Sequence, residues 1–326
     1  MFVIFVVAVV LIALIAGVYQ KNTNAICTSK KRLDGKTVLV TGGTTGMGLE
    51  IAIDMASRGA RTIIACPFED EGIRAKKLII EKSDNNNVVF KHLDLGCLMS
   101  VKNFAKDILE TEERLDILLN NAGVGILGDF STKDGLNFIM QVNYFGTFQL
   151  TLLLLPLLKK TGQVSEPSRI VNTASILHWI GVMDFDCMNK VGHYFKVRIY
   201  GNSKLCVVYF TRELAKRLQG SNVVVNSVDP GAVGTKILES GNKILGMFLR
   251  YYFFLLFKTP WQGAQTALHV ALDKDAGTLS GKFFRNCQIS RAAWWAYDDK
   301  VAKKLWDESL RLVKLNESDV EAWLKN

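Results

Sequence analysis

Residues 36–48 read Lys36-Thr37-Val38-Leu39-Val40-Thr41-Gly42-Gly43-Thr44-Thr45-Gly46-Met47-Gly48, and segment 49–57 after them has helical periodicity. A short apolar strand, a glycine-rich turn and a helix thus follow one another. Glycines let the main chain turn sharply and approach a pyrophosphate, while a helix N-terminus offers unpaired N–H groups and a positive dipole end. This order predicts a doubly wound α/β domain that binds a dinucleotide. Its candidate cofactor contacts are Gly42, Thr44, Thr45, Gly46, Met47 and Gly48.

Apolar runs further along the chain predict the remaining strands of one parallel sheet, at 61–66, 88–93, 115–119, 223–228 and 282–284. Asp94 and Leu95 follow the run 88–93, where an aspartate is placed to meet an adenine; an ordinary loop-start aspartate is the alternative. The run 115–119 leads into Asn120-Asn121-Ala122-Gly123. Small residues there let the main chain run close to a cofactor, and an Asn can tie adjacent strands by side-chain hydrogen bonds. Asn121, Ala122 and Gly123 are therefore further candidate contacts.

Composition favours one large domain in a reducing compartment. The chain has 326 residues, of which 49% are apolar and 22% charged, enough for one α/β core. Its cysteines lack metal-type spacing, so we expect reduced thiols and no metal site. They are Cys27, Cys66, Cys97, Cys187, Cys206 and Cys287. The net charge of +9 comes without a nucleic-acid motif, so a membrane surface is the better-fitting partner and no nucleic acid is expected.

The first 20 residues predict a membrane anchor. From Phe2 to Tyr19 every residue is apolar, Gly or Tyr, and 18 helical residues span about 27 Å, close to the hydrocarbon thickness. A cleaved signal peptide is the alternative, but a positive n-region and a cleavage site are missing. The segment 21–34 is a basic linker, which by the positive-inside rule leaves the body facing the cytosol. Monotopic insertion stays open.

The stretch 198–205, Arg-Ile-Tyr-Gly-Asn-Ser-Lys-Leu, predicts an acid/base pair. On a helix, Tyr200 and Lys204 stand at i and i+4 on one face. A fixed cation near a phenol favours the phenolate and lowers its pKa from about 10 towards the working pH. By itself this spacing is more often a half-buried ring beside a solvated charge.

Taken together, these patterns resemble the short-chain dehydrogenase/reductase family. The matching pieces are Thr41-Gly42-x-x-x-Gly46-x-Gly48, Asn120-Asn121-Ala122-Gly123, Asn143, Ser175, Tyr200-x-x-x-Lys204 and Pro230-Gly231, in the family's order over residues 35–290. The segments 142–148, 169–172 and 211–215 and the long interval from Ser175 to Tyr200 resemble the retinol-dehydrogenase-like branch. The resemblance implies a single Rossmann-type doubly wound parallel sheet in domain 35–290, with residues 291–326 as a C-terminal helical extension of the same domain.

The resemblance also implies a mechanism of hydride transfer between a nicotinamide and an alcohol or carbonyl carbon. Tyr200 would exchange the hydroxyl proton, and Lys204 would lower the tyrosine pKa and bind the nicotinamide ribose. Ser175 would donate to the substrate oxygen, and Asn143 would hold the water chain that carries the proton away. The turn after the sixth strand would close over the nicotinamide. Its implied contacts are Pro230, Gly231, Val233 and Thr235.

An apolar segment within the predicted lid favours a lipophilic substrate, and the family resemblance suggests which substrate and which membrane. Residues 244–257 are nearly all apolar, in the region of about 236–258 where this family builds its substrate lid. The segment is either buried all round or presents apolar surface to lipid and a hydrophobic substrate. Retinol or retinal is the expected substrate, in an enzyme of the endoplasmic reticulum membrane. A steroid, farnesol-like alcohol or fatty aldehyde is the alternative, and a non-catalytic membrane-tethered binding module is the alternative of another class.

The resemblance favours NADP(H) over NAD(H), with one departure. The branch typically carries an arginine for the 2′-phosphate where this chain has Pro67, and Glu69 and Asp70 nearby would repel that phosphate. Arg74, one helical turn further on, would compensate. A homodimer through the helices that carry Asn143 and Tyr200 is a further expectation of the resemblance.

Overall fold

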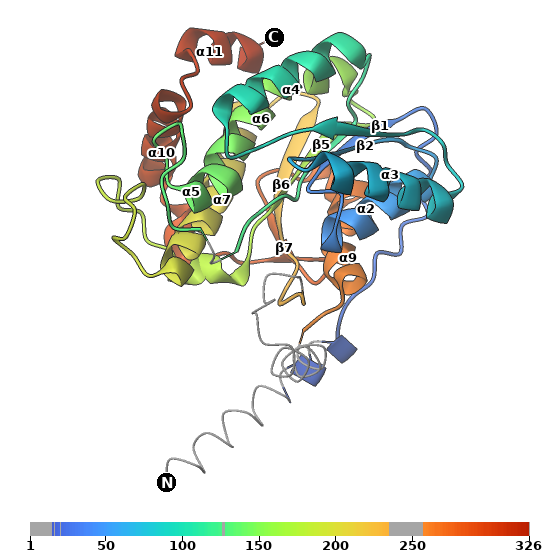
Figure 1. The fold of residues 1–326 in the computed structure, drawn as a ribbon, viewed down its shortest axis with the longest axis horizontal. Coiled ribbons are helices and arrows are strands. Elements are labelled where there is room, and N and C mark those ends of the chain that lie inside the picture. The colour runs from blue at the N-terminus through green and yellow to red at the C-terminus, as the bar shows by residue number, and fades with distance from the viewer. Residues whose placement is uncertain (1–14, 16, 20, 126–127, 235–256, 326) are drawn as a thin grey trace.

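A single eight-stranded sheet with helices on both faces forms the body (Figure 1). The computed structural model describes residues 15, 17–19, 21–125, 128–234 and 257–325. Seven strands run parallel in the order β3-β2-β1-β4-β5-β6-β7, and β8 pairs antiparallel with β7 at the edge. The strands are β1 (Thr37–Thr41), β2 (Arg61–Cys66), β3 (Val88–His92), β4 (Ile117–Asn120), β5 (Ser168–Thr173), β6 (Val223–Asp229), β7 (Phe283–Arg285) and β8 (Gln288–Ser290).

Two helical layers cover the sheet, and each encloses its own apolar cluster. On one face lie α2 (Gly46–Ser57), α3 (Glu69–Ser83) and α9 (Pro260–Leu272), as Figure 1 shows. On the other lie α4 (Leu98–Thr111), α6 (Gly146–Thr161), α7 (Lys196–Arg217) and α10 (Asp299–Leu312). The shorter helical elements are α5 (Phe138–Met140), η1 (Gln141–Phe145), η2 (Ile176–Ile180), η4 (Ala276–Thr278), η5 (Trp294–Tyr297) and α11 (Glu317–Lys325).

The doubly wound fold predicted from the sequence is confirmed, and the strand boundaries agree to within two residues. The sequence did not predict β8, because this edge strand is largely exposed and lacks the apolar run that marked the buried strands. Within residues 291–326, where a helical extension was expected, the helix α10 ends at Leu312 and α11 follows as a separate helix. All six cysteines are free.

One described helical segment is long and apolar enough to cross a membrane, but it lies within the core. It runs from Phe138 to Thr161, and 89% of its most apolar window is buried. Burial against α4, α7 and β5 explains its largely apolar sequence. The predicted anchor at 1–20 and the predicted lid at about 236–258 lie almost entirely outside the described residues.

A buried amide ladder ties neighbouring strands where the sequence predicted one. Asn120 Nδ2 at the end of β4 donates to Asn172 Oδ1 on β5 over 2.8 Å, and Asn172 Nδ2 donates to Thr211 Oγ1 on α7 over 3.0 Å. These bonds fix the carboxyl ends of β4 and β5 relative to α7. Parallel α/β sheets bind ligands at this edge.

Candidate active site

The helix α7 brings Tyr200 and Lys204 onto one face, as their spacing predicted. The Lys204 Nζ lies 5.7 Å from the centroid of the Tyr200 ring. The ammonium is buried, with 3% of the residue exposed, and it donates to the Thr173 carbonyl at the end of β5 over 2.9 Å. A buried cation requires such a partner because it has lost its water.

Ser175 lies where β5 gives way to η2. Its side chain caps η2, accepting from the Leu177 N–H over 3.2 Å, and it also forms a hydrogen bond with the Tyr200 hydroxyl. The turn is held by His178, a residue that the sequence analysis missed. The His178 Nε2 accepts from the Ala293 N–H over 2.9 Å, so its Nδ1–H is the donor to the Ser175 carbonyl at 2.6 Å. Its position three residues after Ser175 was the only available signal.

Asn143 occupies the π-helical turn η1, a backbone form frequent at functional sites. Its Oδ1 accepts from the Val124 N–H over 2.7 Å, and its Nδ2 donates to the Val124 carbonyl and to Ser203 Oγ, each over 3.0 Å. A Cβ on Gly123 would lie 3.2 Å from Asn143 Oδ1 and 3.5 Å from Lys204 Nζ. The structure therefore brings Asn143, Gly123 and Lys204 together, as the resemblance implied.

Burial controls the ionisation of the Tyr200–Lys204 pair. Desolvation lowers the pKa of Lys204 to about 8. Desolvation raises the pKa of Tyr200, the hydrogen bond from Ser175 opposes this rise, and the charge of Asp229 adds to it. This differs from the expectation that Lys204 brings the tyrosine pKa down. The physical reason is that the ammonium is directed to the Thr173 carbonyl, so burial dominates at the phenol.

The glycine turn packs against the end of β4 and leaves no space for side chains. A Cβ on Gly42, where φ is +63°, would lie 2.9 Å from the Ala122 Cα, and a Cβ on Gly48 would lie 2.0 Å from the Gly42 carbonyl oxygen. Asn121 Nδ2 donates to the Thr41 carbonyl over 3.1 Å. The turn precedes the N-terminus of α2, which starts at Gly46 without a side-chain cap. This cradle of main chain and free N–H groups fits a dinucleotide pyrophosphate.

The remaining predicted contacts lie along the same edge of the sheet. Met47 is half-buried near Val233, since a Cβ on Gly263 would meet both side chains, and Leu95 is buried against Gly146. Asp94 follows β3, and its Oδ1 accepts from the Gly96 N–H over 2.8 Å, which makes it at least a loop-start aspartate. Pro230 and Gly231 follow β6, and Thr235 lies outside the described residues.

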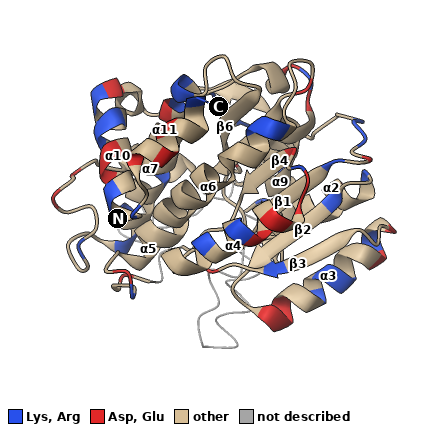
Figure 2. Cartoon of the chain, turned by 90° about the horizontal axis from the view of Figure 1, so that it is seen from above, with Lys and Arg blue, Asp and Glu red and all other residues tan. Residues whose placement is uncertain are grey.

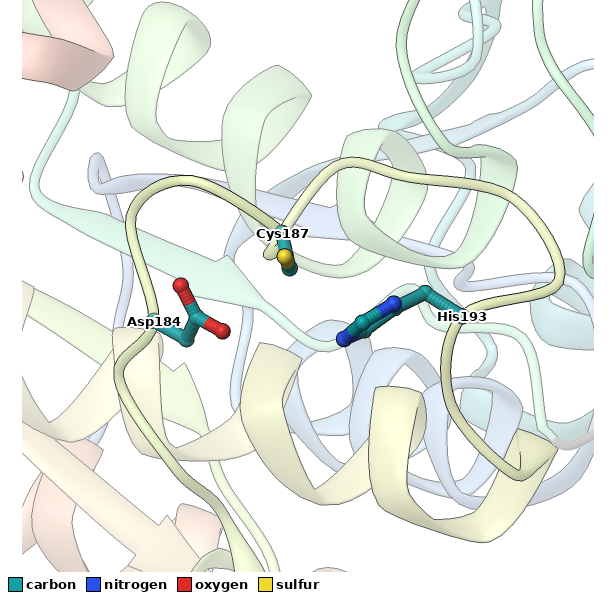
Figure 3. A group of neighbouring side chains, drawn as sticks. All are labelled: Asp184, Cys187 and His193. Carbon is teal, nitrogen blue, oxygen red and sulfur yellow. The ribbon is translucent and has the colours of Figure 1, made fainter.

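A separate group of potential metal ligands lies in the loop before α7, formed by Asp184, Cys187 and His193 (Figure 3). Asp184 Oδ2 already accepts from the Tyr194 hydroxyl over 3.0 Å, and Lys190 Nζ lies 3.6 Å from Cys187 Sγ. Two of the three side chains thus have protein partners, and we assign no ion to them.

The Lys204 pKa predicts a pH dependence of stability. Between pH 8 and 10.5 the unfolded chain still binds the Lys204 proton that the folded protein has released. The free energy of unfolding should therefore rise with pH across this window, by up to about 3 kcal/mol. Lys204→Met, which has a neutral side chain of similar length, should lack this rise. Denaturant unfolding of both proteins from pH 7 to 10.5 measures it, and parallel pH profiles would contradict the assignment.

Comparison with known proteins shows the family of this chain. The family profile for short chain dehydrogenase matches residues 36–244. Human retinol dehydrogenase 13 is 41% identical over 303 residues, covering 91% of this chain and 90% of that protein. Mouse retinol dehydrogenase 11 is 40% identical over 90% of this chain and 91% of its own length. Bovine dehydrogenase/reductase SDR family member 13 is 39% identical, over 89% of this chain and 76% of its own length.

Solved structures show the same fold. An uncharacterised protein from Mycobacterium paratuberculosis has a TM-score of 0.71 and 27% identity, over 90% of this chain and 98% of that one. Pseudomonas aeruginosa RhlG, in an active-site complex with NADP, has a TM-score of 0.60 and 23% identity, over 78% of this chain and 95% of that one. From its sequence and its fold, this chain belongs to the short-chain dehydrogenase family and is an oxidoreductase that uses a nicotinamide cofactor.

Proposed function

We propose that the protein interconverts retinol and retinal, or a closely similar lipophilic alcohol and carbonyl. The observation that carries the proposal is the Ser175–Tyr200–Lys204 arrangement at the carboxyl edge of the sheet, in a chain about 40% identical to retinol dehydrogenases along nearly its whole length. These relatives' names indicate the substrate. The cofactor would be a nicotinamide dinucleotide whose adenosine ribose lies at the end of β2.

In this mechanism the protein handles the proton and the developing charge. The bound nicotinamide supplies or accepts the hydride. Tyr200 exchanges the hydroxyl proton, and Ser175 donates to the substrate oxygen as negative charge develops on it. Lys204 orients the ribose beside Gly123, and Asn143 holds the exit path for the proton through its fixed contacts with Val124.

Another lipid remains as the second candidate substrate, because one relative at 39% identity is named only as a dehydrogenase/reductase. The two readings predict different rankings in a substrate panel of retinal, a steroid ketone, farnesal and a fatty aldehyde. A non-catalytic binding module would be expected to have lost at least one of Asn143, Ser175, Tyr200 and Lys204. All four are present, so we favour turnover.

The test of the substrate is oxidation of NADPH and, separately, NADH by the full-length protein in membranes with all-trans-retinal. We expect retinol as the product, identified chromatographically. Turnover of a steroid or fatty aldehyde without turnover of retinal would contradict the retinoid assignment and identify that lipid as the substrate. Inactivity towards the whole panel with both cofactors would contradict catalysis.

Tyr200→Phe should reduce turnover by about a thousandfold or more, since the phenyl ring cannot exchange the hydroxyl proton. Cofactor affinity should stay within about twofold, because the ring keeps its shape and Lys204 its position. Steady-state kinetics and titration of the dinucleotide measure the two effects. Tyr194→Phe, at an equivalent phenol outside the site, is the matched control. Undiminished turnover in Tyr200→Phe would end the assignment.

We further propose that the carboxyl edge of the sheet faces a membrane. The start of the basic linker lies at this edge: Ala25 N–H donates to Asn286 Oδ1 over 2.8 Å, and Asn24 Nδ2 donates to the Gln262 carbonyl over 3.4 Å. Asn286 follows β7, whose carboxyl end lies beside that of β6, and Figure 1 shows the linker beside α9. An anchor in residues 1–20 would therefore join the body on the same side as the substrate site, and this side would face the membrane.

Exposed tryptophans support this orientation. Trp294 is 76% exposed at the start of η5, and Trp261 is 47% exposed at the start of α9, close to the docked linker. By contrast, Trp295 and Trp323 pack against the core. Tryptophan favours the boundary between lipid and water, where the ring is buried and its N–H stays hydrated.

Trp294 should therefore contact lipid. In vesicles of brominated phosphatidylcholine, part of the tryptophan fluorescence of the full-length protein should be quenched, and Trp294→Ala should reduce that part. Trp306→Phe, at a core position, should keep it. Equal lipid quenching in wild type and Trp294→Ala would contradict the orientation.

A further inference from the structure

The adenosine end of the cofactor cradle contains a carboxylate that the mechanism does not use. Thr44 Oγ1, in the glycine turn, donates to Glu71 Oε1 over 2.5 Å. Cys66, the last residue of β2, lies beside both side chains, and its Sγ–H donates to the Phe68 carbonyl over 3.2 Å. Burial raises the pKa of the Cys66 thiol, so this thiol stays neutral. Glu71 is therefore the charged group held at the end of β2.

The sequence around Glu71 adds negative charge at the same place. The first turn of α3 contains Glu69, Asp70 and Glu71, and no side chain caps it; Figure 2 shows this acidic turn at one end of the helix. These carboxylates already complement the positive end of the helix dipole, which would otherwise attract a phosphate. Pro67 offers neither charge nor an N–H at the preceding position.

A doubly wound dinucleotide site distinguishes its two cofactors at the end of this strand. A carboxylate accepts hydrogen bonds from the ribose hydroxyls of NAD(H), whereas a basic side chain binds the 2′-phosphate of NADP(H). A carboxylate fixed by Thr44 in a partly buried contact would repel that phosphate.

We propose that Glu71 is a specificity-determining residue that makes the protein select NAD(H) over NADP(H). This rests on the nicotinamide site of the proposed function, and it reverses the preference implied by the family resemblance. Arg74 does not compensate, because it lies one turn further along α3 on an exposed face, outside the Thr44–Cys66–Glu71 contact. Since cytosolic NAD is kept mainly oxidised and NADP mainly reduced, an NAD-selecting site directs the enzyme towards oxidation of the alcohol.

Binding of adenosine fragments tests the ribose site without turnover. The full-length protein in detergent is titrated with adenosine 5′-monophosphate and with adenosine 2′,5′-bisphosphate, each displacing NADH monitored by its fluorescence. The same titrations are made on Glu71→Gln and on Asp70→Asn. The latter removes an equal charge from the same turn, at an exposed side chain for which we find no contact with Thr44.

We expect the wild type to bind the monophosphate at least about tenfold more tightly than the 2′,5′-bisphosphate, as for a charged hydrogen-bond partner. In Glu71→Gln this ratio should fall at least about fivefold. Asp70→Asn removes a charge that solvent and salt screen and that Thr44 does not hold, so it should lower the ratio in the same direction but by less than about twofold. Tighter binding of the bisphosphate by the wild type would overturn the proposal, and so would an unchanged ratio in Glu71→Gln. Failure to reduce retinal would leave these affinities unaffected, so the two proposals fail separately.

Discussion

Burial of the Lys204 ammonium is the constraint on which the rest of the site depends. A cation out of water requires a fixed acceptor, and the Thr173 carbonyl at the end of β5 provides it. This bond joins α7 to the sheet at the point where Ser175 continues the chain. Gly123 must then lack a side chain, because a Cβ there would crowd both Lys204 and Asn143. One buried charge thus holds together Tyr200, Ser175 and Gly123, for which we propose the roles of proton donor, oxyanion donor and ribose site.

The same carboxyl edge gathers features that come from distant parts of the sequence. The glycine turn, the amide ladder of Asn120 and Asn172, and the docked linker all lie there. The linker contacts Asn286 and Gln262 through main-chain and amide groups, and further along it Lys31 forms an ion pair with Glu166 over 2.7 Å, so hydrogen bonds and charge together set its path. A lipophilic substrate leaving a bilayer would meet the site on this side of the body.

The sequence predicted the elements and most of the chemistry because these are local. Strands such as Arg61–Cys66 can be recognised as apolar runs, and the spacing of Tyr200 and Lys204 places the phenol and the ammonium on one helical face. The contacts that were missed join separate elements. The Thr44–Glu71 bond connects the glycine turn with α3, and His178 connects η2 with η5. The sequence around each of these residues does not indicate which distant residue it contacts. The direction of the shift in the Tyr200 pKa was missed for a related reason. Burial of the ring raises this pKa, and burial depends on the whole fold and not on the local sequence.

Isotope tracing can follow the transfer of hydride from the cofactor to the substrate, and it can show whether that cofactor is NADH, as we propose for Glu71. The full-length protein in membranes is supplied with retinal and with NADH or NADPH, each carrying deuterium at both positions of the nicotinamide C4. The structure predicts deuterium at the carbinol carbon of retinol, with a much higher rate from labelled NADH than from labelled NADPH. Retinol formed without deuterium would contradict direct hydride transfer, and faster labelling from NADPH would contradict the role of Glu71.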